Sequence, residues 1–207
     1  MRHTLYLMRH GESEVNAADP PVIGGRSRWA ELTPLGVEQS RRLGRWLGEQ
    51  QIPVDRIISS TAVRAQQTAR YALDALKIPR RRLETFVRLE EMSQGEWENQ
   101  LRTAVRTPAV MAQMDRETWH FRAPGGESMS DVYERGLRFI QDEVLAAPHA
   151  HTWIFCHGMV IKTLLAGVMG LERTTAWQIW IDNASLTVLE HEDGQWTERM
   201  RSVVPPQ

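Results

Sequence analysis

The 207-residue sequence has little cysteine, almost no net charge and no long apolar run, and each of these shortages excludes a class of protein. Cys156 is the only cysteine, so no intramolecular disulfide can form and the chain suits a reducing compartment. A formal net charge of -1 gives no general attraction to nucleic acid, so any anion site must be built from locally gathered arginines. No apolar run approaches the roughly 20 residues that cross a bilayer, and no leader-like segment opens the sequence. We therefore expect a cytoplasmic protein that binds neither nucleic acid nor a membrane.

What the sequence does contain is a regular alternation of strand-like and helix-like segments. Hydrophobic residues make up 42% of the chain, which is enough to bury a substantial core, and we expect residues 1–207 to form one domain. The alternation predicts an α/β fold, a three-layer α/β/α sandwich with a mostly parallel central sheet. A helical or loop insertion at about residues 98–126 is expected to lie as a lid over the carboxyl ends of the strands.

Six apolar runs predict the strands of this sheet. The first ends at Arg9, and the others are residues 56–59, 85–89, 152–156, 186–189 and 196–200. The last two are expected to form a hairpin around Asp193-Gly194, a dipeptide that favours tight turns.

Hydroxyl side chains mark the expected helix starts. Thr33 followed by Pro34 predicts the amino-terminal cap of a helix over residues 33–48, and residues 159–169 predict a largely apolar helix. The other expected caps are Ser60 or Thr61 after the second strand, and Ser128, which forms a shortened capping box with Asp131. The expected core residues on these elements are Leu35, Leu43, Trp46, Leu47, Val132, Leu137, Ile140, Val144, Trp153 and Trp180.

The first strand-like run delivers Arg9-His10-Gly11 at the point where the strand should end, which is where open α/β sheets bind ligands. A guanidinium presents a planar fork of donors to phosphate oxygens, and a neutral imidazole can attack phosphorus. Gly11 permits a sharp turn and a close approach of the backbone to a ligand. A histidine after a strand is more often structural, so the interpretation depends on partners elsewhere in the chain.

Three later segments place complementary chemistry at strand ends. Arg64 falls in the first turn of a helix, where a basic residue disfavours the helix itself and so indicates a ligand. Residues 89–98 follow the third strand and offer carboxyl groups for proton transfer. His157-Gly158 follows the buried run 152–156 and repeats the opening pattern. Two histidines, two arginines and a carboxyl group at neighbouring strand ends suit phosphoryl transfer through a phosphohistidine.

At these residues the chain resembles branch 1 of the histidine phosphatase superfamily, the phosphoglycerate mutase-like proteins with an Arg-His-Gly motif, over nearly its whole length. The resemblance implies that His10 attacks phosphorus and that Glu91, rather than Glu90, protonates the leaving oxygen and later activates water. It also implies that the arginines occupy the role of a cation, so that neither a metal nor another cofactor is expected. The residues expected around the substrate phosphate are Arg9, Gly11, Asn16, Arg64, His157 and Gly158.

The substrate is less sharply indicated by the sequence. Residues 102–122 mix basic and apolar side chains, which suits a small phosphorylated metabolite with an acidic or an apolar body. Residues 92–95, Met-Ser-Gln-Gly, differ from the corresponding run of phosphoglycerate mutases and favour hydrolysis. Sugar phosphates, phosphoserine, phosphoglycerates and ribazole phosphate all stay open, as do two alternative functions, a mutase and a non-catalytic phosphoryl-binding module.

For several residues a structural role is an alternative to a functional one. Glu90, Glu96 and Glu98 are expected at the solvated surface or at a helix entry, and Cys156 as a small buried residue rather than a nucleophile. Trp29, Trp97 and Trp119 are expected in loops beside the mouth of the site. Residues 179–181 and the last strand could supply the interface of a homodimer.

Overall fold

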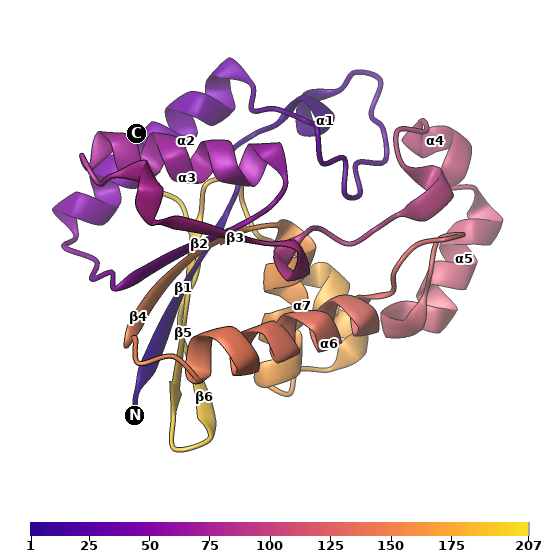
Figure 1. Cartoon of the computed structure of the whole chain (residues 1–207). Helices are drawn as coiled ribbons and strands as arrows, with labels where there is room; N and C mark the ends of the chain where they lie inside the picture. Colours follow the sequence, from indigo (N-terminus) through magenta and orange to yellow (C-terminus); the bar gives the residue numbers. More distant parts are fainter. Residues whose placement is uncertain (207) are drawn as a thin grey trace.

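The computed structural model describes residues 1–206, and the side chains of all of these except 173–175. A six-stranded sheet runs through it in the order β3-β2-β4-β1-β5-β6 (Figure 1). Its strands are β1 (His3–Arg9), β2 (Arg56–Ser60), β3 (Leu83–Phe86), β4 (His151–Cys156), β5 (Leu186–Glu192) and β6 (Gln195–Val203). The first four strands in that order are parallel, whereas β5 and β6 are antiparallel to their neighbours. The predicted α/β fold with a mostly parallel sheet is confirmed.

Helices cover both faces of the sheet, as Figure 1 shows. The helices α2 (Pro34–Glu49) and α3 (Val63–Ala75) lie on one face, and α6 (Met129–Phe139) and α7 (Gly158–Val168) lie on the other. The short helices are α1 (Glu14–Ala17), α4 (Arg102–Val105) and α5 (Pro108–Glu117). The remaining turns are η1 (Arg80–Arg82), η2 (Val87–Leu89), η3 (Gly95–Trp97), η4 (Thr118–His120), η6 (Arg173–Gln178) and the π-helix η5 (Ile140–Leu145). Within residues 1–206, no helix has the length and apolar character needed to cross a membrane.

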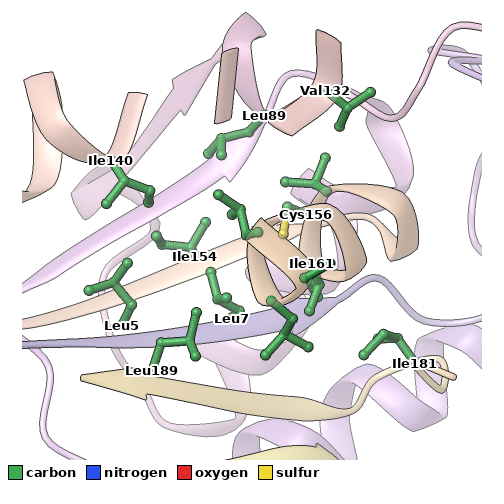
Figure 2. Close-up of a cluster of buried hydrophobic side chains, with 14 of the residues drawn as sticks. Leu5, Leu7, Leu89, Val132, Ile140, Ile154, Cys156, Ile161, Ile181 and Leu189 are labelled. Carbon is green, nitrogen blue, oxygen red and sulfur yellow. The ribbon is translucent and has the colours of Figure 1, made fainter. Parts of the chain in front are cut away.

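Alternation along β1 divides the core into two layers, because successive side chains of a strand point to opposite faces. Leu5 and Leu7 pack with α6 and α7, whereas Tyr6 and Met8 pack with α2 and α3. Figure 2 shows the first of these layers, with Cys156 among its aliphatic side chains. Cys156 is fully buried, which confirms the prediction of a small buried residue, and burial raises the pKa of its thiol.

The predicted helix starts are confirmed where a side chain can cap its own helix. Thr33 Oγ1 accepts the backbone N–H of Gly36 at 3.1 Å, and Ser128 forms the capping box with Asp131. The cap predicted at Ser60 or Thr61 was wrong. The residue before α3 is Ala62, whose side chain makes no capping hydrogen bond. The hairpin around Asp193-Gly194 is confirmed.

Other expectations about strands and burial were wrong. The third strand ends at Phe86, and the chain then turns through η2. Leu35 and Trp180 are 54% and 71% exposed, although their apolar spacing predicted core positions. Trp119, expected in a loop at the mouth, is only 2% exposed because it packs into the core beside Tyr133.

Residues 98–126 form α4, α5 and η4, which lie together to one side of the sheet in Figure 1. Buried Trp119 and Phe121 anchor the carboxyl end of this segment. Most of α5 is exposed, and none of its residues is fully buried. The segment is therefore attached at its end and presents the face of α5 to solvent or to a ligand.

Candidate active site

The two histidines come from neighbouring strands in the centre of the sheet. In the parallel register of β1 and β4, Arg9 lies opposite Cys156, so His10 and His157 leave the same edge of the sheet side by side. Their ring centroids are 5.1 Å apart in an edge-to-face arrangement. Both rings are buried, with exposures of 3% for His10 and zero for His157. The topology thus explains why two similar strand ends far apart in the sequence meet.

One nitrogen of His10 is set by its own backbone. Nδ1 lies 2.7 Å from the carbonyl oxygen of Gly11, an acceptor only, so Nδ1 carries the proton and Nε2 keeps its lone pair. Burial, followed by the charges of Arg64 and Arg9, lowers the pKa of His10 well below its ordinary value. At neutral pH this imidazole is uncharged, with Nε2 available as a nucleophile.

The contacts of His157 favour the opposite tautomer. Its Nε2 lies 2.9 Å from Ser60 Oγ, which already accepts the backbone N–H of Ala62 and can donate its own proton to the ring. Nδ1 is then the protonated nitrogen, and it is buried without a hydrogen-bond partner. Burial and the charge of Arg64 lower the pKa of His157 well below its ordinary value, so it too is neutral at neutral pH.

Both predicted arginines lie near enough to this pair of rings for their charges to act on it. Arg64, at the start of α3, donates from Nε to His10 Nε2 at 3.1 Å, and its other nitrogens are held by the carbonyls of residues 25–27 at 2.8 to 3.3 Å. Arg9 donates from Nη1 to the carbonyl of Ile181, while its Nε is buried without a partner. Burial lowers the pKa of each guanidinium, yet an arginine stays charged at any physiological pH. Two fixed positive charges therefore flank His10.

Two atoms of this cluster are buried donors with nothing to bind. Arg9 Nε and His157 Nδ1 are two of the four buried side-chain nitrogen and oxygen atoms without a partner among the described residues. Leaving such a group unsatisfied costs about 1–3 kcal/mol, so a bound acceptor would stabilise this cluster. Gly158 lies against the same guanidinium, since a Cβ placed on it would be 3.4 Å from Arg9 Nε. These donors suit an anion.

Glu91 lies at the boundary between this cluster and an open cavity. Its Oε1 accepts the backbone N–H of Met92 at 2.9 Å and that of Met159, in the first turn of α7, at 3.2 Å. The cavity has a volume of about 160 Å³. It is lined by Ile23, Gly24, Gly25, Glu91, Met92, Gln94, Arg102, Arg106, Met114, Phe121, Ala123, Glu127, Met159 and Trp177. The carboxylate is thus the link between the histidine cluster and the space beside α4 and α5.

Asn16 and Gly11, two other predicted ligands, have hydrogen-bond partners within the chain. Asn16 is exposed, and its Oδ1 accepts hydrogen bonds from Ser13 and from Asn183 Nδ2, which also donates to the carbonyl of His10. Gly11 lies close to another part of the chain. Its N–H donates to Thr68 Oγ1, and a Cβ on it would lie 2.5 Å from the carbonyl oxygen of Gly36.

A buried charge network beside the site was not predicted from the sequence. Glu90, expected at the surface, is 2% exposed and binds Arg28 through both carboxylate oxygens at 2.7 and 2.8 Å. A second ion pair joins Glu127 to Arg135 at 2.9 Å. A usable signal was present, because Arg135 falls on the same face of α6 as the buried Val132 and Phe139. A charged residue in that position indicates an internal partner.

Acidic and histidine side chains do not gather into a metal-binding group: within residues 1–206 no three of these or of cysteine lie close enough to hold an ion. The chemical resources of the site are therefore a neutral imidazole with a free lone pair, two guanidinium groups, unused N–H donors and one carboxylate beside a cavity.

The chain also matches a known family over nearly its whole length. The family model of the histidine phosphatase superfamily (branch 1) matches residues 5–203, and the chain belongs to that family. A probable phosphoglycerate mutase GpmB of Yersinia pestis (strain Pestoides F) is 32% identical over 196 residues, covering 93% of this chain and 86% of the relative.

Solved structures of phosphatases share the fold at lower identity. A mycobacterial glucosyl-3-phosphoglycerate phosphatase in complex with VO3 has a TM-score of 0.83 at 24% identity, covering 97% of this chain and 99% of that one. A putative alpha-ribazole-5'-P phosphatase from Escherichia coli K-12 has a TM-score of 0.81 at 23% identity and covers 99% of both chains. These two similarities establish the architecture of the chain. The chain is therefore a member of the superfamily that has phosphatases among its structural neighbours.

Proposed function

We propose that this chain is a phosphomonoesterase that hydrolyses a small phosphorylated metabolite through a phosphohistidine on His10. The observation that carries the proposal is the pair of buried, unpartnered donors, Arg9 Nε and His157 Nδ1, beside an imidazole whose Nε2 is unprotonated. A phosphoryl group next to His10 would supply the missing acceptors. Binding and chemistry would then use the same donors.

In the first step, His10 Nε2 forms a bond to phosphorus as the ester P–O bond breaks. Arg64 Nε, now donating to that lone pair at 3.1 Å, would turn its hydrogen bond to a phosphoryl oxygen. A protonated Glu91 gives its proton to the departing alkoxide, which leaves as an alcohol. The guanidinium groups stabilise the charge on the equatorial oxygens, so the step requires no metal and no other cofactor.

In the second step, water attacks phosphorus and the N–P bond breaks, which returns the electron pair to Nε2. Glu91, left ionised by the first step, takes the proton of the water. Inorganic phosphate then departs and the original protonation states are restored. Gly158, at the start of α7, and Asn16 complete the proposed phosphate surroundings.

The body of the substrate is proposed to lie in the cavity of about 160 Å³ beside Glu91. A second hollow of about 420 Å³ adjoins it through the shared lining residues Arg106, Met114 and Trp177. The relatives point both ways, since one is named a mutase and the structural neighbours are named phosphatases. The run Met92-Ser93-Gln94-Gly95 after Glu91 favours hydrolysis.

The test is phosphate release from p-nitrophenyl phosphate in the presence of a chelator, together with trapping of acid-labile phosphate on the protein. His10→Ala should lower turnover by about four orders of magnitude or more and abolish the trapped phosphate. A variant that keeps either would refute the proposal. Isomerisation of a phosphoglycerate without phosphate release would instead indicate the mutase, and tight phosphate binding without turnover the binding module.

Two expectations from the sequence are carried forward as proposals. Trp180 is 71% exposed beside the last strand and would lie in the homodimer interface. The oligomeric state in solution, with Trp180→Ser for comparison, tests this. We also propose that the protein acts in the cytoplasm.

A further inference from the structure

We infer that Arg135 and Glu127 are positioning residues that hold the Glu91 carboxylate in the orientation it needs to transfer a proton. The inference rests on the proposed role of Glu91 and concerns residues that lie outside the histidine cluster. Glu91 lies in the segment between β3 and η3, and the ion pair of Arg135 and Glu127 holds the backbone of this segment.

Arg135 binds the backbone on the amino-terminal side of Glu91. It projects from α6 with a side chain only 17% exposed. Nη1 donates to the carbonyl of Arg88 at 2.8 Å, and Nη2 donates to the carbonyls of Glu90 at 2.6 Å and Glu91 at 3.2 Å. No strand ladder is available for these three carbonyls, because β3 has ended at Phe86. The guanidinium replaces the missing ladder.

Glu127 binds the backbone on the other side. Its Oε2 accepts the N–H of Ser93 at 2.9 Å, and its own N–H donates to the carbonyl of Ser93 at 2.9 Å. Its Oε1 accepts from Arg135 Nε at 2.9 Å, and Arg26 Nη2 lies 3.1 Å from the same oxygen. One ion pair therefore spans the chain on both sides of Glu91.

The surroundings of Glu127 favour its ionised form. Burial opposes ionisation of Glu127, but the hydrogen bond and charge of Arg135, the Ser93 amide and Arg26 together keep its pKa below the ordinary value. Arg135 uses its planar fork on a carboxylate and three carbonyls at once, an arrangement that a lysine ammonium cannot reproduce.

The consequence falls on one step of catalysis. Among the described residues, the backbone N–H groups of Met92 and Met159 orient the Glu91 carboxylate. A displacement of the segment around Glu91 would spoil the alignment of its carboxylate with the leaving oxygen, whereas His10, Arg9 and Arg64 are held by β1, β4 and α3. A misplacement of about 1 Å can lower a rate by about 100-fold. Loss of the ion pair should therefore affect proton donation more than attack on phosphorus.

Leaving groups separate these effects. A nitrophenolate departs without a proton, whereas an alkoxide needs one, and kcat/KM reports the steps up to the first P–O cleavage. We would measure kcat/KM for p-nitrophenyl phosphate and for an alkyl phosphate in five proteins: wild type, Arg135→Met, Arg135→Lys, Glu127→Gln and Glu91→Gln. Arg138→Met is the matched control, because Arg138 lies on the same helix with a side chain 74% exposed.

Arg135→Met should lower kcat/KM for the alkyl phosphate by about 10- to 100-fold and that for p-nitrophenyl phosphate by less than about threefold. Arg135→Lys and Glu127→Gln should show the same selectivity with a smaller loss, and Arg138→Met should change neither value. These two variants keep the test decisive if Arg135→Met does not fold.

An equal loss on both substrates, or none, in variants that fold would overturn the inference, provided that Glu91→Gln is selective for the alkyl phosphate. If Glu91→Gln itself shows no dependence on the leaving group, the proposed role of Glu91 fails and the inference fails with it. The two failures are thus distinguished by one variant.

Discussion

Replacing Glu90 by glutamine tests whether the buried carboxylate supports both the fold and Arg64. Glu90 is 2% exposed and accepts two hydrogen bonds from Arg28 and one from Thr61 Oγ1 at 2.7 Å. Arg28 belongs to the loop whose carbonyls, at residues 25–27, hold the guanidinium of Arg64. The substitution keeps the shape of the side chain and removes its charge.

The expected magnitude follows from these contacts. A hydrogen bond to a charged group contributes about 1.5–3 kcal/mol, but the Arg28 side chain is 58% exposed, so solvent screening reduces its share. Glutamine still offers one acceptor oxygen to Thr61 and turns an NH₂ group toward Arg28. We expect a loss of about 2 kcal/mol in the free energy of unfolding, which lowers Tm by about 4–8 °C in a chain of this size.

Activity should fall together with stability. Because Arg64 acts on the phosphoryl group and not on the leaving oxygen, kcat/KM should fall by about 10-fold for nitrophenyl and alkyl phosphates alike. The assay is thermal unfolding with both kinetic measurements. Glu84→Gln is the control, since Glu84 also binds an arginine, Arg56, through both oxygens but is 49% exposed. A Tm loss for Glu90→Gln no larger than that of Glu84→Gln, with unchanged activity, would refute the reasoning.

Two further predictions concern pH and the cavity. Folding lowers the pKa of His10 and His157 below about 6.5, so below that pH the unfolded chain binds more protons than the folded one. Each histidine should therefore lower the free energy of unfolding by up to about 1.4 kcal/mol per pH unit as the pH falls. Chemical denaturation between about pH 7 and pH 5 checks this, and the variant with both histidines replaced by asparagine should show a shallower slope. Arg106 lines both cavities, and burial and Arg102 lower its pKa. If Arg106 binds a second anionic group of the substrate, Arg106→Gln should raise KM by about 10-fold for a phosphomonoester with such a group and leave KM for p-nitrophenyl phosphate nearly unchanged. Equal KM changes for the two substrates would contradict this role.

Local chemistry made much of the fold predictable. Thr33, Ser128 and the Asp193-Gly194 turn act on their own neighbours in sequence, and each was confirmed. The strand-end histidines were predictable for a related reason, since a parallel sheet brings the carboxyl ends of its strands to one edge.

Features that depend on distant partners were not predictable. Leu35 and Trp180 carry apolar side chains at plausible spacings, but the pattern does not tell which face another element covers. Glu90 differs from a surface glutamate through Arg28, which lies 62 residues away in sequence, and through Thr61. The placement of Asn16 and Gly11 likewise depends on Asn183 and Gly36.

The pairing of β1 with β4 also bears on how activity would be lost. Both strands are interior, with β5 and β2 hydrogen-bonded to their outer sides, so their amide protons are shielded from solvent on every edge. Fraying at β3 or β6 leaves this ladder intact, and amide exchange at its centre requires opening of the whole sheet. The spacing of the two imidazoles would consequently persist until the molecule unfolds globally.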